Sequence, residues 1–300
     1  MSPAAARLRV FTAAALFSTG GAAFKLCGFT GWQVAGLRGA VAALVVLALV
    51  PAARGTWGWR LGLVGCAYAA TTILFVQANK LTTAASAVFL EDASPVFVLV
   101  LGPLLLRERA RRSDLVFLAA ALCGMAFFFL GVEPPRATAT NPVLGNLLSA
   151  VSSVTFAFTV IGYRWLAHHT GGGTGSVAAA LVSGNLTAFV FSLPWALPIA
   201  AGAPRDWVVI AYLGIVQLGL GYVVLAQAVP HATALDVSLL LLLEPVLNPI
   251  WAWLVHREVP GVWSVAGGGI ILGAVAVKVW SDSRRLDVRK SRRSATGATT

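Results

Sequence analysis

The sequence predicts an all-α integral membrane protein whose ten transmembrane helices form two inverted five-helix repeats. Three observations support this fold class. First, 58% of the 300 residues are apolar and only 11% are charged, with a mean hydropathy of +0.82, which leaves too little polar surface to cover a soluble core. Second, ten apolar stretches divide the chain. Third, the two halves match at an offset of 150 residues.

The ten stretches meet the length that a membrane requires. A helix needs about 20 apolar residues to cross about 30 Å of hydrocarbon. Charges, Pro/Gly clusters or tryptophans separate the stretches, and the linkers are too short to hold an extramembrane domain. We interpret the first stretch as a retained helix rather than a signal peptide, because nine further spans follow and no clear cleavage site precedes Lys25. The expected spans are 9–27, 33–50, 58–79, 83–106, 113–131, 143–165, 176–197, 206–228, 233–256 and 260–280.

The distribution of lysine and arginine predicts the orientation. Successive linkers between ten helices lie on alternate sides of the membrane. This places sixteen basic residues on the side of the N-terminus and five on the other side, with Arg38 inside the second span. Cytoplasmic loops are enriched in these residues, so we expect both termini to be cytoplasmic. A chain rich in alanine and arginine without an organelle signal indicates a bacterial inner membrane. Eight tryptophans near the expected helix ends support the boundaries: Trp32, Trp57, Trp59, Trp165, Trp195, Trp207, Trp263 and Trp280.

Charge and cysteine usage exclude several other classes of protein. The net charge of +11 does not indicate nucleic-acid binding, because the bases fall between apolar stretches and in the last 17 residues. Cys27, Cys66 and Cys123 contain no C-x-x-C pair, so we expect neither a disulfide framework nor a thiolate metal site. No G-K-[ST] follows the glycines at 267–269, which argues against a nucleotide loop. We therefore expect no metal and no cofactor.

The internal repeat has consequences for topology. Five helices are an odd number, so the second copy must enter the membrane from the opposite side. Two inverted halves give two nearly isoenergetic arrangements, one open to each side, which is a common basis of alternating access in secondary transporters. We expect the first repeat over 1–140, the second over 141–281 and a basic cytoplasmic tail over 282–300. The matches include Gln77-Ala78 with Gln227-Ala228, Pro95-Val96 with Pro245-Val246, and Arg107-Glu108 with Arg257-Glu258.

The residues resemble a known family of membrane proteins. The sequence is similar to the EamA-type transporters of the drug/metabolite transporter (DMT) superfamily. The similarity lies in Lys25 followed by Arg38-Gly39-Ala40 in an apolar second span, and in the matched runs 77–108 and 227–258. The resemblance covers essentially residues 5–280. It implies ten helices in two inverted repeats, a central cavity lined chiefly by the third, fourth, eighth and ninth helices, and export of small metabolites, often amino acids.

Ionisable residues inside the second and fourth spans are candidates for the site. Each costs about 3 kcal/mol or more to insert, so such residues tend to persist for pairing or function. At a rise of about 1.5 Å per residue, Glu91 and Asp92 lie roughly 12 Å below the outer edge and Arg38 about 8 Å below it, within reach of an ion pair. Two interpretations remain open for the acids, a structural pair with Arg38 or a site for a substrate charge or a proton.

The second half contributes its own candidates. Glu244 precedes Pro245 near the middle of the ninth span, and Pro95 occupies the matching position of the fourth. Proline removes a backbone donor, so we expect matched helix kinks that point to the central site. Tyr68 and Gln217 are polar groups at middle depth and are expected to contact substrate. For Glu244, proton coupling or orientation of a substrate cation competes with a simple hydrogen bond to the loosened backbone.

These observations favour a secondary transporter, an exporter of a small metabolite such as an amino acid or a similar amphipathic compound. The expected driving force is the proton gradient or the gradient of the substrate itself. The expected partners are this small-molecule substrate, a proton and the lipid bilayer, whose anionic headgroups would attract the basic tail at roughly 1 kcal/mol per base. A membrane scaffold or receptor-like protein is the alternative. An intramembrane enzyme is disfavoured, because G-x-S-G with a partner histidine, G-x-G-D and H-E-x-x-H are all absent.

Overall fold

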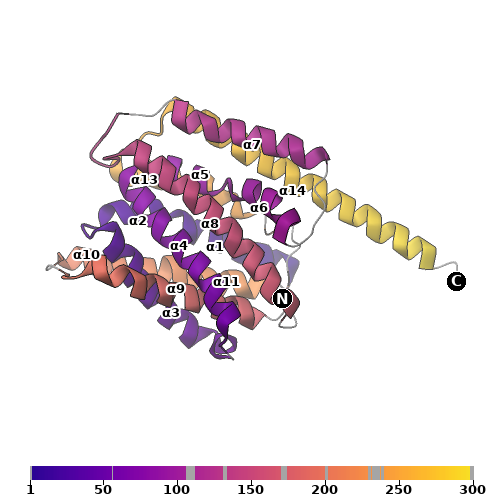
Figure 1. Ribbon diagram of the computed structural model, residues 1–300, viewed down its shortest axis with the longest axis horizontal. Helices are drawn as coiled ribbons and strands as arrows, with labels where there is room; N and C mark the ends of the chain where they lie inside the picture. The colour runs from indigo at the N-terminus through magenta and orange to yellow at the C-terminus, as the bar shows by residue number, and fades with distance from the viewer. Residues whose placement is uncertain are drawn as a thin grey trace.

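The structure, a computed structural model of the chain, is built from helices packed side by side (Figure 1). Every regular element in the described part of the chain is helical, which confirms the all-α class. Arg107 and Glu108, which the repeat matched to Arg257 and Glu258, lie outside the described residues. The structure describes residues 2–55, 57–105, 112–130, 134–169, 174–199, 202–228, 231, 237 and 240–297.

In the described residues of the first half there are seven α-helices and one short 3-10 helix. The first expected span is divided, because α1 ends at Ser18 and α2 begins at Gly20. The fourth is divided as well, with a turn at Asp92 and Ala93. The bounds are α1 Pro3–Ser18, α2 Gly20–Leu26, α3 Gly31–Leu49, η1 Pro51–Arg54, α4 Trp59–Leu81, α5 Ala84–Glu91, α6 Ser94–Leu105 and α7 Arg112–Leu130.

The second half includes a nine-residue π-helical segment, η2, between two α-helical segments. The wider turn of a π-helix is uncommon and often occurs at functional sites. Two glycines of η2 face α3 at close range: a Cβ added at Gly214 would lie 2.5 Å from Val41 Cβ, and one at Gly219 would lie 2.7 Å from Val45 Cγ1. The bounds are α8 Pro142–His169, α9 Thr174–Ala196, α10 Pro204–Ala211, η2 Tyr212–Leu220, α11 Gly221–Ala228, α13 Leu243–His256 and α14 Val262–Gly297.

Six helical stretches in the described residues are long and apolar enough to cross a membrane, and two shorter apolar helices accompany them. The expected count of ten spans is therefore matched only in part, since breaks such as the one after Ser18 leave pieces too short to qualify alone. The six are Gly31–Leu49, Trp59–Leu81, Ala84–Gly102, Pro142–Leu166, Gly175–Ala196 and Pro204–Ala228, and the shorter two are Leu115–Leu130 and Val262–Lys278.

Helices of the two halves interleave. The helix α4 packs against α8 and α9, and α3 packs against α9 and η2. The pair α7 and α14 lies along one side of the molecule, where α14 extends past the other helices (Figure 1). These two helices approach closely because glycines face each other: a Cβ at Gly124 would lie 2.8 Å from the carbonyl oxygen of Gly267.

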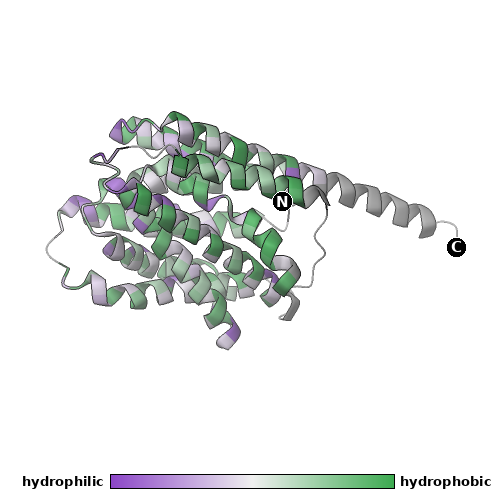
Figure 2. Cartoon of the chain, turned by 45° about the horizontal axis from the view of Figure 1, so that its top comes forward, coloured by the Kyte–Doolittle hydropathy of each residue, from purple (hydrophilic) through white to green (hydrophobic). Residues whose placement is uncertain are grey.

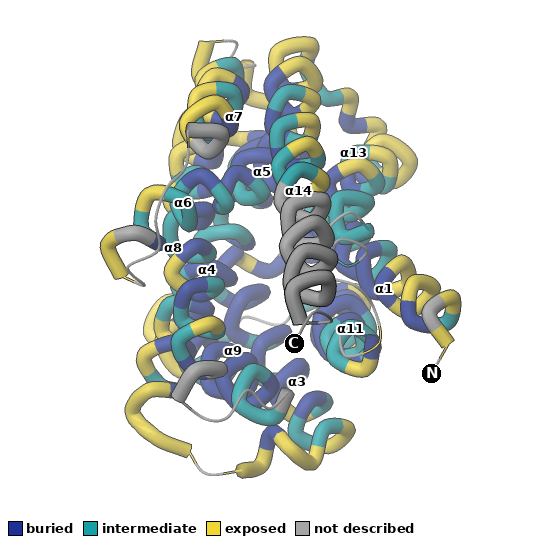
Figure 3. The backbone as a smooth tube through the Cα atoms, turned by 90° about the vertical axis from the view of Figure 1, so that its right-hand side faces the viewer, coloured by how far each residue is buried: buried dark blue, intermediate teal, exposed yellow. Residues whose placement is uncertain are grey.

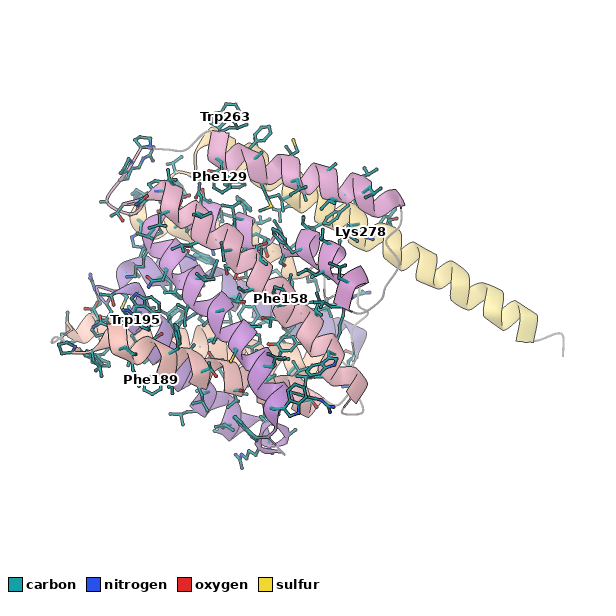
Figure 4. All side chains as sticks on the ribbon, viewed as in Figure 1. Phe129, Phe158, Phe189, Trp195, Trp263 and Lys278 are labelled. Carbon is teal, nitrogen blue, oxygen red and sulfur yellow. The ribbon has the colours of Figure 1, made fainter. Side chains whose placement is uncertain are left out.

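The outer faces of the bundle are apolar. Hydrophobic residues run along the helices, while hydrophilic ones gather mainly near the connections (Figure 2), and residues turned away from the interior are exposed (Figure 3). Large aromatic side chains belong to this outer surface (Figure 4): Phe129, Phe158, Trp195 and Trp263 are between 42% and 53% exposed. In water such a surface would be unfavourable, but in a bilayer it faces lipid.

Candidate functional site

Arg38 is buried in a polar layer between the two halves of the chain. The residue is 3% exposed. Its Nη2 donates a hydrogen bond of 2.6 Å to Thr72 Oγ1 on α4, and its Nη1 donates one of 3.3 Å to Gln217 Oε1 on η2. The guanidinium carbon lies 4.8 Å from the centre of the Phe24 ring, a distance typical of a cation–π contact. Arg38 therefore connects α2, α3, α4 and η2 at one point.

The expected ion pair between Arg38 and Glu91 or Asp92 is not formed. The terminal nitrogens of Arg38 donate to the neutral oxygens of Thr72 and Gln217, and its Nε has no hydrogen-bond partner. Glu91 interacts with the guanidinium only as a charge at longer range. The two side chains are directed to different neighbours: Arg38 donates to Thr72 on α4 and Gln217 on η2, whereas Glu91 accepts from Ser152 on α8.

The two adjacent acids have different surroundings. Glu91 Oε1 accepts a hydrogen bond of 3.0 Å from Ser152 Oγ on α8, and the same hydroxyl lies 3.1 Å from the carbonyl oxygen of Thr71 on α4. Asp92 Oδ2 is buried and has no hydrogen-bond partner. Ser152 was not predicted as a site residue, because serine inside a membrane helix usually bonds to its own backbone. Here it joins an acid of the first half to a helix of the second.

Glu244 completes the acidic group from the second half. It lies in the first turn of α13. Its carboxyl is close enough to those of Asp92 and Glu91 for their charges to interact. The structure thus brings the adjacent acids Glu91 and Asp92 of the first half near Glu244 of the second. The guanidinium of Arg38 interacts with the charge of Glu91.

Pro95 and Pro245 each follow an interruption of the helix. Pro95 is the second residue of α6, after the turn at Asp92 and Ala93, and Pro245 is the third residue of α13, after a turn at Leu242. Proline is tolerated in a first turn because its missing N–H would have no intrahelical partner there. The structure therefore places the matched prolines at the starts of helices beside the acids, rather than at kinks within continuous helices.

Tyrosines border the charged group. Tyr68 on α4 and Tyr222 on α11 approach each other with their hydroxyl oxygens 3.5 Å apart and their rings edge to face. Both tyrosines interact with the charge of Arg38. The hydroxyl of Tyr163 is buried and has no hydrogen-bond partner. Tyr68 was predicted as a site residue, whereas Tyr222 was missed, although a polar aromatic residue on the same span as Gln217 was an available signal.

The break between α1 and α2 also contacts this layer. Gln217 Nε2 donates a hydrogen bond of 3.3 Å to the carbonyl oxygen of Phe17, and the Tyr212 hydroxyl donates one of 2.9 Å to Thr19 Oγ1. A Cβ added at Gly20 would lie 3.0 Å from Gln217 Nε2, so a larger residue would press on the amide. Interrupted backbone at membrane depth is tolerated where protein groups satisfy it, and side chains of η2 supply those groups here.

The arrangement suits the binding of cations or protons. Three half-buried carboxyl groups lie near the buried guanidinium of Arg38, so neutrality requires additional positive charge or protonation. Within the described residues no group of three or more His, Cys, Asp or Glu side chains is arranged to hold a metal ion. Hydroxyls of Ser152, Tyr68 and Tyr222 add groups that can both donate and accept hydrogen bonds.

Comparison with known proteins identifies related sequences. The sequence model of the EamA-like transporter family matches residues 6–130 and again residues 143–280. Two curated relatives are the pseudopaline exporter CntI of Pseudomonas aeruginosa strain UCBPP-PA14 and its counterpart in strain PAO1. Each is 30% identical over 192 residues, which cover 63% of this chain. The chain spans 64% of the length of these relatives.

A solved structure supports the fold. A chain described as "Crystal structure of protein" superposes with a TM-score of 0.62 and 22% sequence identity. The superposition covers 95% of this chain and 99% of the other. At this identity the likeness concerns the arrangement of helices alone.

Proposed function

The chain belongs to the EamA-like transporter family, and from this premise we propose that it is a secondary transporter that exports a small metabolite by alternating access. The proposed substrate is an amino acid or a similar amphipathic compound. The family match covers both halves of the chain, and the curated relatives are exporters by name. The observation that carries the proposal is the buried, electrically unbalanced group of charges at the junction of the halves.

In this proposal Glu244 binds a proton or a cationic group of the substrate, and Glu91 or Asp92 provides a second polar contact. Asp92 Oδ2 has no hydrogen-bond partner, which leaves it available to a substrate amine. Arg38 attracts the anionic end of the substrate, while Tyr68 and Gln217 provide hydrogen bonds to it. A compound with separate amine and carboxylate groups would match both signs of charge in the region.

The two repeats are proposed to occupy 1–140 and 141–281, each with five spans, followed by the basic tail over 282–300. The double family match supports this division, and so do the matched helix breaks before Pro95 and Pro245. The close packing of α3 on α9 and of α4 on α8 joins the halves. A shift of one half against the other would therefore change access to the acids from one side to the other.

We place both termini in the cytoplasm of a bacterium and the spans in its inner membrane, with the basic tail at anionic lipid. A reporter fused after Arg293 is expected to behave as cytoplasmic, and one inserted near Arg136 as external. An external C-terminus would contradict the ten-span topology and the inverted repeat together.

The test of function is a flux measurement on reconstituted protein. Untargeted metabolite profiling of cells that overexpress the chain selects the compounds to be tested. Proteoliposomes with the purified protein are then expected to move at least one of them, faster with a pH gradient than without it. Binding without movement would indicate the receptor-like alternative. A matched control is Val246→Ala, which lies next to Pro245 on α13 and is 47% exposed.

A further inference from the structure

A buried ion pair closes one end of the helix bundle. Lys25 lies in the last turn of α2, and Glu258 follows α13. Lys25 Nζ and Glu258 Oε2 are 3.0 Å apart, and both side chains are 3% exposed. Glu258 is directed inward by its neighbour, because Arg257 caps α13 in the left-handed region at φ 56°. A non-glycine residue rarely adopts this conformation.

Main-chain groups complete the surroundings of this pair. Lys25 Nζ also donates a hydrogen bond of 2.7 Å to the carbonyl oxygen of Thr82, and another to that of Thr138. Glu258 Oε1 accepts a hydrogen bond of 2.6 Å from the N–H of Ala84, the first residue of α5. Both charges are therefore neutralised and hydrogen bonded. Four segments meet at this pair: the α2 helix, the α4–α5 connection, the segment before α8 and the α13–α14 connection.

The pair joins the two proposed repeats. Lys25, Thr82, Ala84 and Thr138 belong to the first, and Glu258 belongs to the second. Further hydrogen bonds join the two repeats at this end of the molecule: Gly28 N to Asp206 Oδ1 at 2.7 Å, Gln33 Nε2 to Ala196 O at 3.0 Å, and Ser86 Oγ to Ser264 Oγ at 3.0 Å. The distribution of basic residues assigns this end to the outer side.

We propose that the Lys25–Glu258 pair is a latch that holds the outer end closed and must separate before the site opens to that side. The proposal rests on the proposed alternating-access function. In the closed state the pair is strong because water is excluded. When α13 moves away from α2 and α5, entering water hydrates both ions and offsets much of the lost attraction. An ion pair can therefore act as a reversible latch.

Cys27 provides a native reporter for opening. It lies two residues after Lys25 and is 3% exposed, with its Sγ 3.8 Å from the carbonyl oxygen of Asp206. The other two cysteines, Cys66 and Cys123, are exposed and can be replaced by serine to give a single-cysteine protein. The rate at which a membrane-impermeant maleimide labels Cys27 from outside then measures how often the outer end opens.

Lys25→Met and Glu258→Gln are each expected to raise the labelling rate of Cys27 roughly tenfold, because either change removes one charge of the latch. The double variant is expected to be labelled no faster than either single variant, since two changes to one interaction are not additive. Lys25→Arg keeps the positive charge, so Cys27 in this variant is expected to be labelled as slowly as in the protein with Lys25. The matched control is Lys80→Met: Lys80 Nζ donates to the carbonyl oxygen of Cys27 at 2.5 Å, but this contact lies within the first repeat.

The labelling also separates this proposal from the proposed function. Three results would overturn the latch even if the wild-type protein transports substrate. The labelling rate of Cys27 is unchanged in both single variants, or the two changes multiply their effects in the double variant, or Lys80→Met accelerates labelling equally. Labelling that increases only from the opposite side of the membrane would overturn it as well. Absence of flux in the wild-type protein would instead contradict the transport function, whatever the labelling shows.

Discussion

Two sets of buried or half-buried charges lie in different parts of this protein, and their partners differ. Where α2 ends and α13 is followed by Glu258, Lys25 and Glu258 form a balanced pair, and each is also hydrogen bonded to main-chain groups. In the polar layer the acids Glu91, Asp92 and Glu244 interact with one another, while Arg38 interacts with the charge of Glu91 and donates its hydrogen bonds to neutral side chains. The first set is complete by itself, whereas the second carries an excess of carboxyl groups.

The difference is consistent with the two proposed roles, a latch for the balanced pair and a binding site for the unbalanced set. A buried charge without a partner is costly, so it either takes up a proton or binds a cation. The balanced pair needs neither, and its strength can be used to hold helices together. The unbalanced set needs a mobile positive charge, which is what a proton or a substrate amine supplies. Neutralising single acids in the two sets should therefore have opposite effects on stability.

The largest expected effect is on coupling at Glu244. Glu244→Gln keeps the shape of the side chain and removes its titration, so the component of flux that depends on the pH gradient is expected to fall roughly tenfold or more. Exchange of substrate across the membrane should survive. The measurement is flux in proteoliposomes with and without a pH gradient, with Val246→Ala as the control. Full gradient dependence in a folded Glu244→Gln protein would remove Glu244 from the coupling mechanism.

The next effect concerns the stability that the Lys25–Glu258 pair provides. Glu258→Gln leaves Lys25 charged and buried, which is expected to cost about 3 kcal/mol. Unfolding of the detergent-solubilised protein would measure the loss as a lower midpoint. Adding Lys25→Met to Glu258→Gln should recover part of the lost stability, because the double variant has no uncompensated buried charge. A Glu258→Gln protein as stable as the wild type would mean that the pair is not the balanced contact described here.

A smaller effect distinguishes the partners of Arg38. The charged hydrogen bond to Thr72 is expected to be worth about 1.5 kcal/mol, so Arg38→Met and Thr72→Val should be non-additive by roughly that amount. Arg38→Met and Asp92→Asn should instead add to within about 0.5 kcal/mol, because these residues form no direct contact. Thermal unfolding of the single and double variants provides both cycles. Strong coupling only to Asp92 would restore the ion pair predicted from the sequence.

The smallest effect has the opposite sign. Asp92→Asn removes one excess charge from the unbalanced set, where Oδ2 has no hydrogen-bond partner, and is expected to stabilise the folded protein by about 1 kcal/mol. The same change should reduce flux, because a contact for the substrate is lost. Together with Glu258→Gln, it tests the opposite signs expected for the two sets. A destabilised Asp92→Asn protein would show that Asp92 has a compensating partner.

Several features were predictable because they depend on the local pattern of residues. Apolar stretches separated by bases require helices in a membrane, and the helices α3, α4, α8 and α9 lie where the stretches predicted them. The family resemblance carried by runs 77–108 and 227–258 is confirmed by the match over both halves. The sequence also selected residues that the structure brings near one another, among them Arg38 with Gln217.

Other features were not predictable because they depend on contacts between distant segments. The expected pair of Arg38 with Glu91 or Asp92 rested on their similar depths in the membrane, but depth does not show which neighbour a side chain faces: Arg38 donates to Thr72 and Gln217, and Glu91 accepts from Ser152. Tyr222 and Ser152 were missed, since nothing local shows that a hydroxyl faces another helix rather than its own backbone. The contact of Lys25 with Glu258 joins residues more than two hundred positions apart, beyond any spacing rule.

By itself the sequence determined the helical class and the apolar spans, since these follow from the composition of each segment and the environment that it can tolerate. The family was indicated by the resemblance of particular runs of residues. Only the tertiary structure decided which buried charges are paired. Charges interact according to distance and to the exclusion of water, and both quantities are set by how helices of the two halves pack together. The sequence therefore revealed that charges are buried in the membrane, and the packing revealed that Lys25 has a carboxylate partner while Arg38 does not.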